Sequence, residues 1–197
     1  MITRRETTLV RKKQIVSAAK KLILKYGSEN VTVRRMANEI GVSEGAIYRH
    51  FESKTEILSF LLDDVENALV IKNRESLSNN AISNLEDMLM SQIASIKQRK
   101  GMSFQIIAEI ISLGDKKLSR QAYEVISKFI EQIKGSLSDG IKTGLIRPDI
   151  DIEAVSILLF GMIQGLVTIW TLSHYRLDLE QKYQYLWIMF RKSIAQN

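Results

Sequence analysis

The stretch from Ser43 to Phe51 carries side chains that could bind a nucleic acid. Its order is Ser43-Glu44-Gly45-Ala46-Ile47-Tyr48-Arg49-His50-Phe51. On a helix, Ile47 and Phe51 lie four residues apart and face inward together, whereas Tyr48 and Arg49 can face outward. Tyrosine, arginine, histidine and serine side chains bind phosphates and base edges, and the small glycine and alanine let the helix backbone approach DNA closely. This composition indicates non-covalent recognition of a polyanion.

Few residues elsewhere could support catalysis. The 197-residue chain has no cysteine, which excludes thiolate nucleophiles, thiolate metal sites and disulfides. His50 and His174 are its only histidines, so a histidine-based triad or a two-histidine metal motif has almost nothing to work with. We therefore expect a protein that is not an enzyme and needs no cofactor or metal. The competing hypothesis is that the protein is an enzyme, and measured turnover would reveal this.

The positive charge of the chain is concentrated at its start. Residues 1–54 hold 12 Lys or Arg against 5 Asp or Glu, whereas residues 55–197 hold 16 against 17. All of the net charge of +6 therefore lies in the first quarter, which is equally consistent with a polyanionic partner there and with a merely solvated basic face. The N-terminus lacks the basic-then-apolar pattern of a signal peptide, so we expect a cytoplasmic protein.

Three short helices are predicted to position the Ser43 to Phe51 stretch. The first ends at Gly27, the second is capped by Thr32 and stops at Gly41, and the third is capped by Ser43 and runs to Phe51. Two helices joined by a three-residue turn that contains glycine form a helix-turn-helix.

The remainder of the sequence is predicted to be helical as well. The expected helices run from about Lys54 to Ser76 behind a Ser53–Glu56 capping box, from a Ser83–Glu86 capping box to about Arg99, over Met102 to Leu113, from Leu118 to about Lys142, after Asp151, and after Asp178 with Gln181. No segment alternates well enough to be a strand. We expect an all-α fold of about nine helices.

The order of residues in this region resembles the tetracycline-repressor (TetR) family of bacterial regulators. The matching run reads Thr32-Val33-Arg34-Arg35-Met36-Ala37-Asn38-Glu39-Ile40-Gly41-Val42-Ser43-Glu44-Gly45-Ala46-Ile47-Tyr48-Arg49-His50-Phe51-Glu52-Ser53-Lys54. It is similar to that family's signature almost end to end, and the likeness covers roughly residues 9–60. The resemblance implies a helix-turn-helix DNA-binding domain over residues 1–53 and a helical ligand-binding and dimerisation domain over residues 54–197.

The resemblance also implies the contacts with double-stranded DNA. Phosphate contacts are expected from Thr32, Tyr48, His50 and Lys54, and contacts with or near the bases from Ser43, Glu44, Gly45, Ala46 and Arg49. Glu44 could accept a hydrogen bond from cytosine N4 or pair with a neighbouring arginine. Arg49 could read a guanine or hold a phosphate. His50 could also be an ordinary surface residue, and Tyr48 could pack in the core.

The resemblance further implies a small apolar or amphipathic effector in the C-terminal domain, which would release a repressor from a palindromic operator. The candidate lining is Met88, Gln92, Gln105, Ile107, Ile111, Phe129, Met162 and Trp170; each of these could equally be an ordinary core residue. A homodimer is expected through helices at about 151–173 and 179–195. The two DNA-binding domains, or heads, of such a dimer are related by a two-fold axis and read paired half-sites. A constitutive architectural DNA binder without an effector is the alternative.

One segment could instead be a membrane-spanning helix, which would conflict with the interpretation that the protein is soluble. Residues 154–173 carry no charge and include Gly161 and Gly165, a spacing found in helix dimers of membranes. Polar residues dilute the segment, and a helix that is apolar all round can also be buried in an interface. We expect an interface or a core, and no membrane partner.

Overall fold

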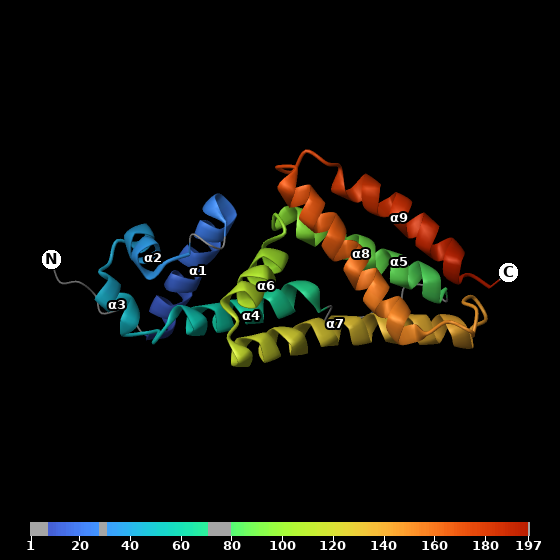
Figure 1. Cartoon of the computed structure of the whole chain (residues 1–197), viewed down its shortest axis with the longest axis horizontal. Coiled ribbons are helices and arrows are strands. Elements are labelled where there is room, and N and C mark those ends of the chain that lie inside the picture. The colour runs from blue at the N-terminus through green and yellow to red at the C-terminus, as the bar shows by residue number, and fades with distance from the viewer. Residues whose placement is uncertain (1–7, 28–30, 71–79, 197) are drawn as a thin grey trace. The chain divides into compact units, whose positions relative to one another are not determined.

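A computed structural model describes residues 8–27, 31–70 and 80–196, and these residues form nine helices (Figure 1). In chain order the helices are α1 (Thr8–Tyr26), α2 (Val33–Ile40), α3 (Glu44–Tyr48), α4 (Lys54–Leu69), α5 (Ala81–Gln98), α6 (Met102–Leu113), α7 (Lys116–Lys142), α8 (Ile152–Leu172) and α9 (Leu179–Ile194). The described residues contain no strand, only an isolated bridge between Ile146 and Ala195. The predicted all-α fold is confirmed.

The chain divides into two compact units. One comprises residues 1–65 and 105–123, and the other comprises residues 66–104 and 124–197. The first unit contains α1 to α3, most of α4, the greater part of α6 and the beginning of α7. The second contains α5, α8, α9 and most of α7.

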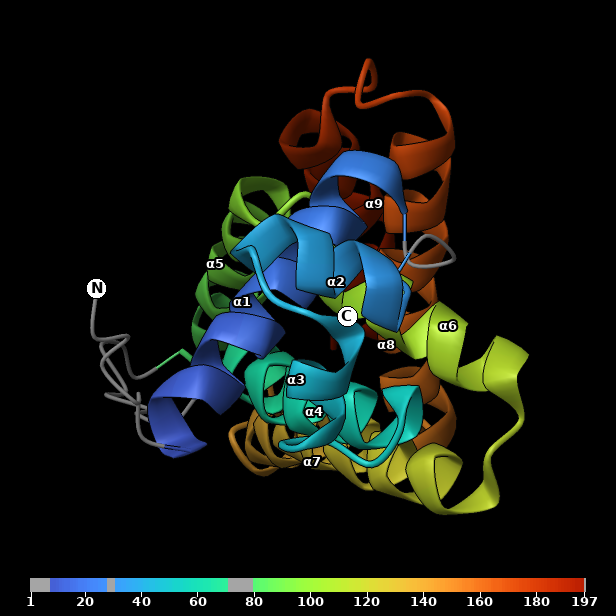
Figure 2. The same cartoon turned by 90° about the vertical axis from the view of Figure 1, so that its left-hand side faces the viewer.

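In the first unit, α2 packs against both α1 and α3 (Figure 2). Ile15 and Ile23 of α1, Met36 of α2 and Ile47 of α3 are each at most 1% exposed. The inward residues recur at helical spacing, so their burial holds the three short helices together. Short helices are marginal alone, and this shared core is what stabilises them.

The predicted capping box at the start of α4 is confirmed with one change of partner. The Glu56 backbone N–H donates to Ser53 Oγ at 3.2 Å. The Glu56 carboxylate accepts from the Glu52 N–H at 2.7 Å, and this bond, together with Lys12, lowers the pKa of Glu56. The box fixes where α4 begins, directly after α3.

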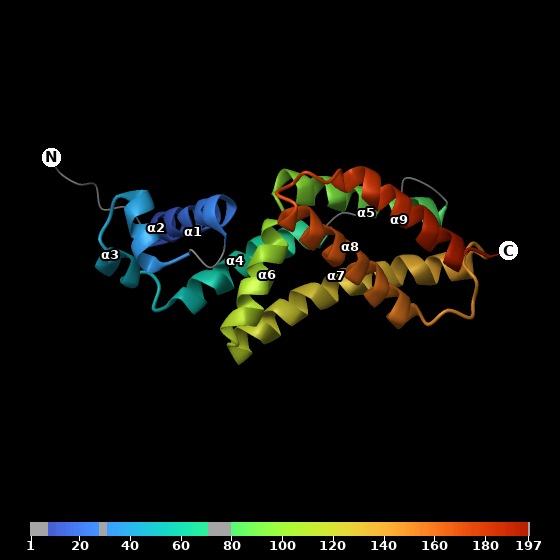
Figure 3. The same ribbon diagram turned by 45° about the horizontal axis from the view of Figure 1, so that its top comes forward.

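In the second unit, α9 lies beside α5 and also packs on α8 (Figure 3). The buried side of α9 presents Tyr183 and Trp187, both almost fully enclosed. Phe160 of α8 contacts Phe129 of α7 and Phe104, with ring centroids 6.3 Å apart in each pair. Aromatic side chains therefore contribute to this core beside its many aliphatic residues.

Three predicted boundaries were wrong. Helix α3 ends at Tyr48 rather than Phe51, because the chain turns there to bury Phe51. The cap of α5 is Asn80, whose Oδ1 accepts from the N–H groups of Ile82 and Ser83 at 3.0 Å, so Ser83 is already inside the helix. Helix α7 begins two residues earlier than expected, at Lys116, because Asp115 accepts from the Leu118 N–H at 2.8 Å. The predicted end of the fourth helix at Ser76 lies outside the described residues.

Candidate nucleic-acid interface

The helix-turn-helix is built by local capping contacts. Thr32 Oγ1 accepts from the Arg35 N–H at 3.2 Å and caps α2, and Ser43 Oγ accepts from the Ala46 N–H at 3.3 Å and caps α3. Gly41 ends α2 with φ of 69°, in the left-handed region that glycine occupies without steric cost. Both expected caps are therefore present, and each hydroxyl retains a lone pair and a proton for a further partner.

Helix α3 presents a polar face to solvent and an apolar face to the core. Ile47 is fully buried, whereas Tyr48 exposes 53% of its surface. The remaining outward candidates on or beside this helix are Glu44, Gly45 and Arg49, which are exposed, and Ala46, which is half-buried. The alternative that Tyr48 packs in the core is excluded, because more than half of its surface is exposed.

His50 follows α3 and is partly buried. Its Nδ1 is enclosed and has no hydrogen-bond partner among the described residues. An enclosed polar nitrogen without a partner is costly, which sets His50 apart from an ordinary surface histidine.

Lys54, the first residue of α4, contacts an acidic side chain of the same unit. Its Nζ lies 2.7 Å from Oε1 of Glu109 on α6, and both side chains are partly buried. Ser59, further along α4, donates to Gln121 Oε1 on α7 at 3.0 Å. The lysine expected to hold a phosphate thus already pairs with a carboxylate, and this pairing could not be predicted from the spacing of the two residues.

A second lysine, Lys12 of α1, lies over two aromatic rings, one of which follows α3 in the chain. Lys12 Nζ lies 4.9 Å from the ring centre of Phe51 and 4.7 Å from that of Phe60, and these two rings meet edge to face at 5.2 Å. The same Nζ is 3.2 Å from Glu56. Because Phe51 closes the end of the α3 segment, Lys12 fixes the position of that segment relative to α1 and α4.

The expected effector-lining residues are divided between the two units. Gln105, Ile107 and Ile111 belong to the first unit, and Met88, Gln92, Phe129, Met162 and Trp170 belong to the second. Gln92 is 3% exposed and donates from Nε2 to the Ala68 carbonyl at 2.8 Å. Ile111 exposes 68% of its surface, which corrects the expectation that it faces an interior. Helix α6 is apolar on nearly all sides, so spacing could not distinguish its outer face.

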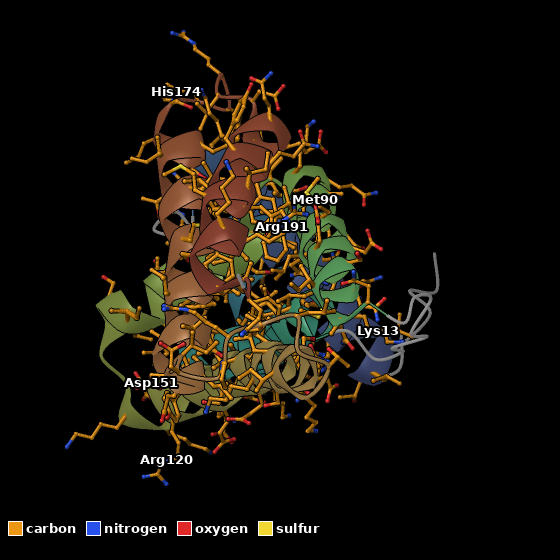
Figure 4. All side chains as sticks on the ribbon, turned by 90° about the vertical axis from the view of Figure 1, so that its right-hand side faces the viewer. Lys13, Met90, Arg120, Asp151, His174 and Arg191 are labelled. Carbon is orange, nitrogen blue, oxygen red and sulfur yellow. The ribbon has the colours of Figure 1, made fainter. Side chains whose placement is uncertain are left out.

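Helix α8 has the length and the apolar composition of a helix that could cross a membrane. Only 28% of its most apolar 18-residue stretch is buried within the chain, so much of its apolar surface is exposed. Its outward face is a row of small and apolar residues: Ala154, Ile157, Leu158, Gly161, Gly165, Ile169 and Leu172. A Cβ at Gly161 or Gly165 would meet no atom of the chain within 4 Å. Figure 4 places Asp151 and His174 at opposite ends of this helix. We call this row the α8 face.

Helix α9 continues the exposed apolar surface. Tyr185, Ile188 and Met189 are 59%, 45% and 69% exposed. On its other side, Arg191 Nη1 lies 3.9 Å from Glu86 Oε2 of α5, at the side of the unit shown in Figure 4. Within the described part of the chain, no group of three His, Asp or Glu residues is close enough to hold a metal ion.

Comparison with known families covers nearly the whole chain. Residues 15–59 match the model described as bacterial regulatory proteins, tetR family. Residues 62–190 match the model of the YsiA-like protein, C-terminal region. The second match alone spans more than half of the chain.

Individual relatives are more distant. The chain is 23% identical over 167 residues to the fatty acid metabolism regulator protein of Bacillus subtilis, covering 84% of this chain and 86% of that protein. Among solved structures, the fatty acid degradation regulator FadR of Bacillus halodurans has a TM-score of 0.75 at 21% identity, over 96% of this chain and 97% of that chain. FadR of Bacillus subtilis in complex with stearoyl-CoA has a TM-score of 0.66 at 22% identity, over 90% and 96%. At identities of 21% and 22%, the similarity to these two structures establishes the fold alone.

Proposed function

This chain belongs to the tetR family of bacterial regulatory proteins and is a DNA-binding transcriptional regulator, and we propose that it is a repressor released from its operator by a fatty acyl-CoA. In this proposal residues 1–53 form the DNA-binding domain and residues 54–197 the domain that binds the effector and dimerises. The single observation that carries the DNA-binding role is the capped, outward-facing α3 of the helix-turn-helix.

The proposed DNA contacts follow from exposure and side-chain chemistry. Tyr48 and Arg49 are exposed on one side of the segment and can donate hydrogen bonds to phosphates or bases. Gly45 brings the α3 backbone close to the major groove because no side chain stands between them. We assign phosphate contacts to Thr32, Tyr48, His50 and Lys54. Base or near-base contacts are assigned to Ser43, Glu44, Gly45, Ala46 and Arg49.

The proposed homodimer is formed through α8 and α9. The α8 face offers apolar side chains around two glycines, and the open space at Gly161 and Gly165 allows a second helix to approach closely. Removing this apolar surface from water would stabilise the dimer by about 25 cal/mol per Å². Covering the face also accounts for the length and hydropathy of α8 in a protein that we assign to the cytoplasm.

Two heads related by a two-fold axis require an operator with the same symmetry. One α3 reads few bases, whereas two read paired half-sites about 34–36 Å apart and multiply the specificity. We therefore propose that the operator is a palindrome. Effector binding would shift α4, which runs from the first unit into the second, and so change the separation of the two heads.

The proposed effector class rests on two observations. The core of the second unit is apolar and rich in aromatic side chains, including the Phe104–Phe160–Phe129 cluster, and it suits a hydrocarbon chain. A relative is named a fatty acid metabolism regulator, and a protein of the same fold was solved with stearoyl-CoA. An acyl-CoA combines an apolar tail with a charged head, which is the amphipathic character expected of the effector.

Binding of selected DNA tests the proposal. The full-length protein is used to select binding sites from a random duplex pool, and the enriched sequence is expected to be an inverted repeat. Fluorescence anisotropy on that sequence is then expected to give affinities roughly tenfold or more weaker for Tyr48→Ala and for Lys54→Ala. Tyr123→Ala, which removes an exposed tyrosine from α7, should bind like the parent. If both test variants also bind like the parent at matched salt, the docking model is wrong.

The effector is tested in the same assay. Stearoyl-CoA is expected to weaken operator binding by the parent, whereas unesterified CoA at the same concentration should weaken it far less. Operator affinity that is unchanged by acyl-CoA thioesters of any chain length would reject this effector class and leave the DNA-binding role intact.

A further inference from the structure

Lys12 of α1 contacts two aromatic rings at the junction between α3 and α4. Its Nζ lies 4.9 Å from the ring centre of Phe51 and 4.7 Å from that of Phe60, and the two rings pack edge to face. A lysine ammonium group is attracted to the negative face of an aromatic ring. One cation therefore holds both a residue that follows α3 and a residue inside α4.

The same lysine also holds the backbone of this junction, through a carboxylate. Glu56 Oε1 lies 3.2 Å from Lys12 Nζ, and Glu56 Oε2 accepts from the Glu52 N–H at 2.7 Å. The Glu56 N–H in turn donates to Ser53 Oγ at 3.2 Å. Lys12 is thus connected, directly or through Glu56, to the three residues that precede α4.

The position of Phe51 determines where the end of α3 lies. The N–H groups of His50 and Phe51 donate to the Ile47 carbonyl at 2.9 and 3.0 Å, so the chain leaves α3 in a tight turn. Ile47 and Phe51 are both buried on the inner side of this turn. Tyr48 and Arg49 lie between them in the chain and are exposed. A displacement of the Phe51 ring would therefore move these two exposed side chains as well.

The position of α3 matters most for binding that depends on the DNA sequence. Hydrogen bonds to base edges need a defined geometry, whereas the attraction of a basic surface to phosphates tolerates displacement and is the same for every sequence. A residue that positions α3 should therefore affect binding to the operator more than binding to random DNA. A lysine that contacts a phosphate directly should affect both alike.

We propose that Lys12 is a positioning residue that sets the specificity of this regulator for its operator. It acts through the two rings and Glu56 rather than by contacting DNA. Its side chain is 24% exposed, and its ammonium group is already engaged by these three contacts. All of the residues involved belong to the first unit. The proposal depends on the DNA-binding role of the protein and not on the identity of its effector.

Another lysine of α1 offers a matched control. Lys20 Nζ lies 2.5 Å from Asp64 Oδ2, so this lysine also joins α1 to α4 by an ion pair between partly buried side chains. Lys20 lies eight residues after Lys12, and Asp64 lies eight residues after Glu56. Lys20→Gln therefore removes the same charge and the same kind of ion pair at a position away from the α3–α4 junction.

Fluorescence anisotropy with the full-length protein measures affinity for the selected operator and for a random duplex at one salt concentration. We expect Lys12→Gln to bind the operator about tenfold more weakly than the parent, and the random duplex less than about threefold more weakly. Lys12→Arg keeps a cation over the rings and should stay within about threefold of the parent on both duplexes. Lys20→Gln should keep the parent's ratio of the two affinities. Circular dichroism establishes that each variant is folded at the temperature of the measurement.

A second variant tests the same contact without changing the charge. Phe60→Leu removes one of the two rings, so it should also lower the ratio of operator affinity to random-duplex affinity, and it serves alone if Lys12→Gln does not fold. Its effect should be smaller than that of Lys12→Gln, because the contacts with Phe51 and Glu56 remain. Since both substitutions remove one shared contact, the double variant should bind the operator within about twofold of Lys12→Gln.

Several results would overturn the proposal. Unchanged operator binding by Lys12→Gln would remove its basis, and equal weakening on both duplexes would make Lys12 a phosphate contact. The same loss of specificity in Lys20→Gln would show that any ion pair between α1 and α4 has this effect. Fully additive losses in the double variant would show that Lys12 and Phe60 act independently on DNA binding.

Discussion

Lys54 Nζ lies 2.7 Å from Glu109 Oε1, so the first residue of α4 is tied to α6 across 55 residues of sequence. The same lysine is the one assigned to a DNA phosphate. A carboxylate and a phosphate cannot both hold one ammonium group at full strength. We therefore propose that operator binding by this protein includes the cost of loosening the contact with Glu109.

Removing that competition should strengthen DNA binding. We predict that Glu109→Gln raises operator affinity severalfold without effector, because Lys54 no longer has to leave a carboxylate to reach a phosphate. Anisotropy titrations at one fixed salt concentration measure this affinity. Glu131→Gln, which removes a carboxylate paired with Lys134, is the matched control. An operator affinity of Glu109→Gln equal to that of the parent would contradict this competition.

An experiment can distinguish whether Glu44 only repels nearby phosphates or reads a base directly. Glu44 is exposed in the first turn of α3, where the helix dipole favours a negative charge but a nearby phosphate opposes it. We expect Glu44→Gln to raise affinity for all sequences by a similar factor and to leave the preferred sequence unchanged. Selection from a random pool with each protein measures this. A shift of preference at a single cytosine position would instead establish direct readout.

The cap of α5 gives a stability test with an internal control. Asn80 accepts two backbone N–H groups, whereas Ser83 lies within the helix. Asn80→Ala should therefore lower the free energy of unfolding by about 1 kcal/mol. Ser83→Ala, three residues later, should change it by no more than about 0.5 kcal/mol. Urea denaturation compares the two, and a larger loss in Ser83→Ala would contradict the assigned cap.

Tyr183 is buried with a hydroxyl that has no partner among the described residues. Burial, with a smaller contribution from Glu86, raises the pKa of this hydroxyl, which is therefore neutral at physiological pH. We predict that Tyr183→Phe leaves stability unchanged or raises it by about 1 kcal/mol, because an unsatisfied polar group is removed without changing the ring. Tyr185→Phe on the exposed side of α9 is the control. Clear destabilisation by Tyr183→Phe alone would show that the hydroxyl is bonded in solution.

In the proposed dimer the two chains approach closely at Gly165. A Cβ there would meet no other part of the single chain within 4 Å, so Gly165→Leu should fold normally. Across a dimer interface the same side chain would separate the two helices, and we predict at least a tenfold rise in the dimer dissociation constant. Sedimentation measurements over a range of concentrations test this, with Arg120→Leu on α7 as a control for added apolar surface. Equal dimerisation of the parent and Gly165→Leu would exclude the α8 face from the interface.

Short-range chemistry made much of this fold predictable. Thr32, Ser43, Asp151 and Asp178 each cap the helix that follows them, as the sequence predicts, because a cap depends only on residues within one turn. Asn80 was missed because Ser83 and Glu86 form an equally good local signal three residues later. Alternative local signals of this kind are resolved only by packing.

The tertiary contacts could not be predicted. The Lys54–Glu109 pair joins helices that the sequence places far apart, and nothing in either segment specifies the other. Ile111 was misplaced because a helix that is apolar on nearly all sides has no periodicity to reveal its outer face.

The open glycines of the α8 face have a consequence for gene dosage. If only the paired form holds both half-sites, the occupied fraction of a promoter follows the square of the chain concentration whenever the protein is scarce. A modest drop in synthesis, or dilution at cell division, would then release the controlled genes more sharply than a monomeric regulator could. The spacing of two residues without side chains would thus set how steeply transcription responds to the abundance of its own regulator.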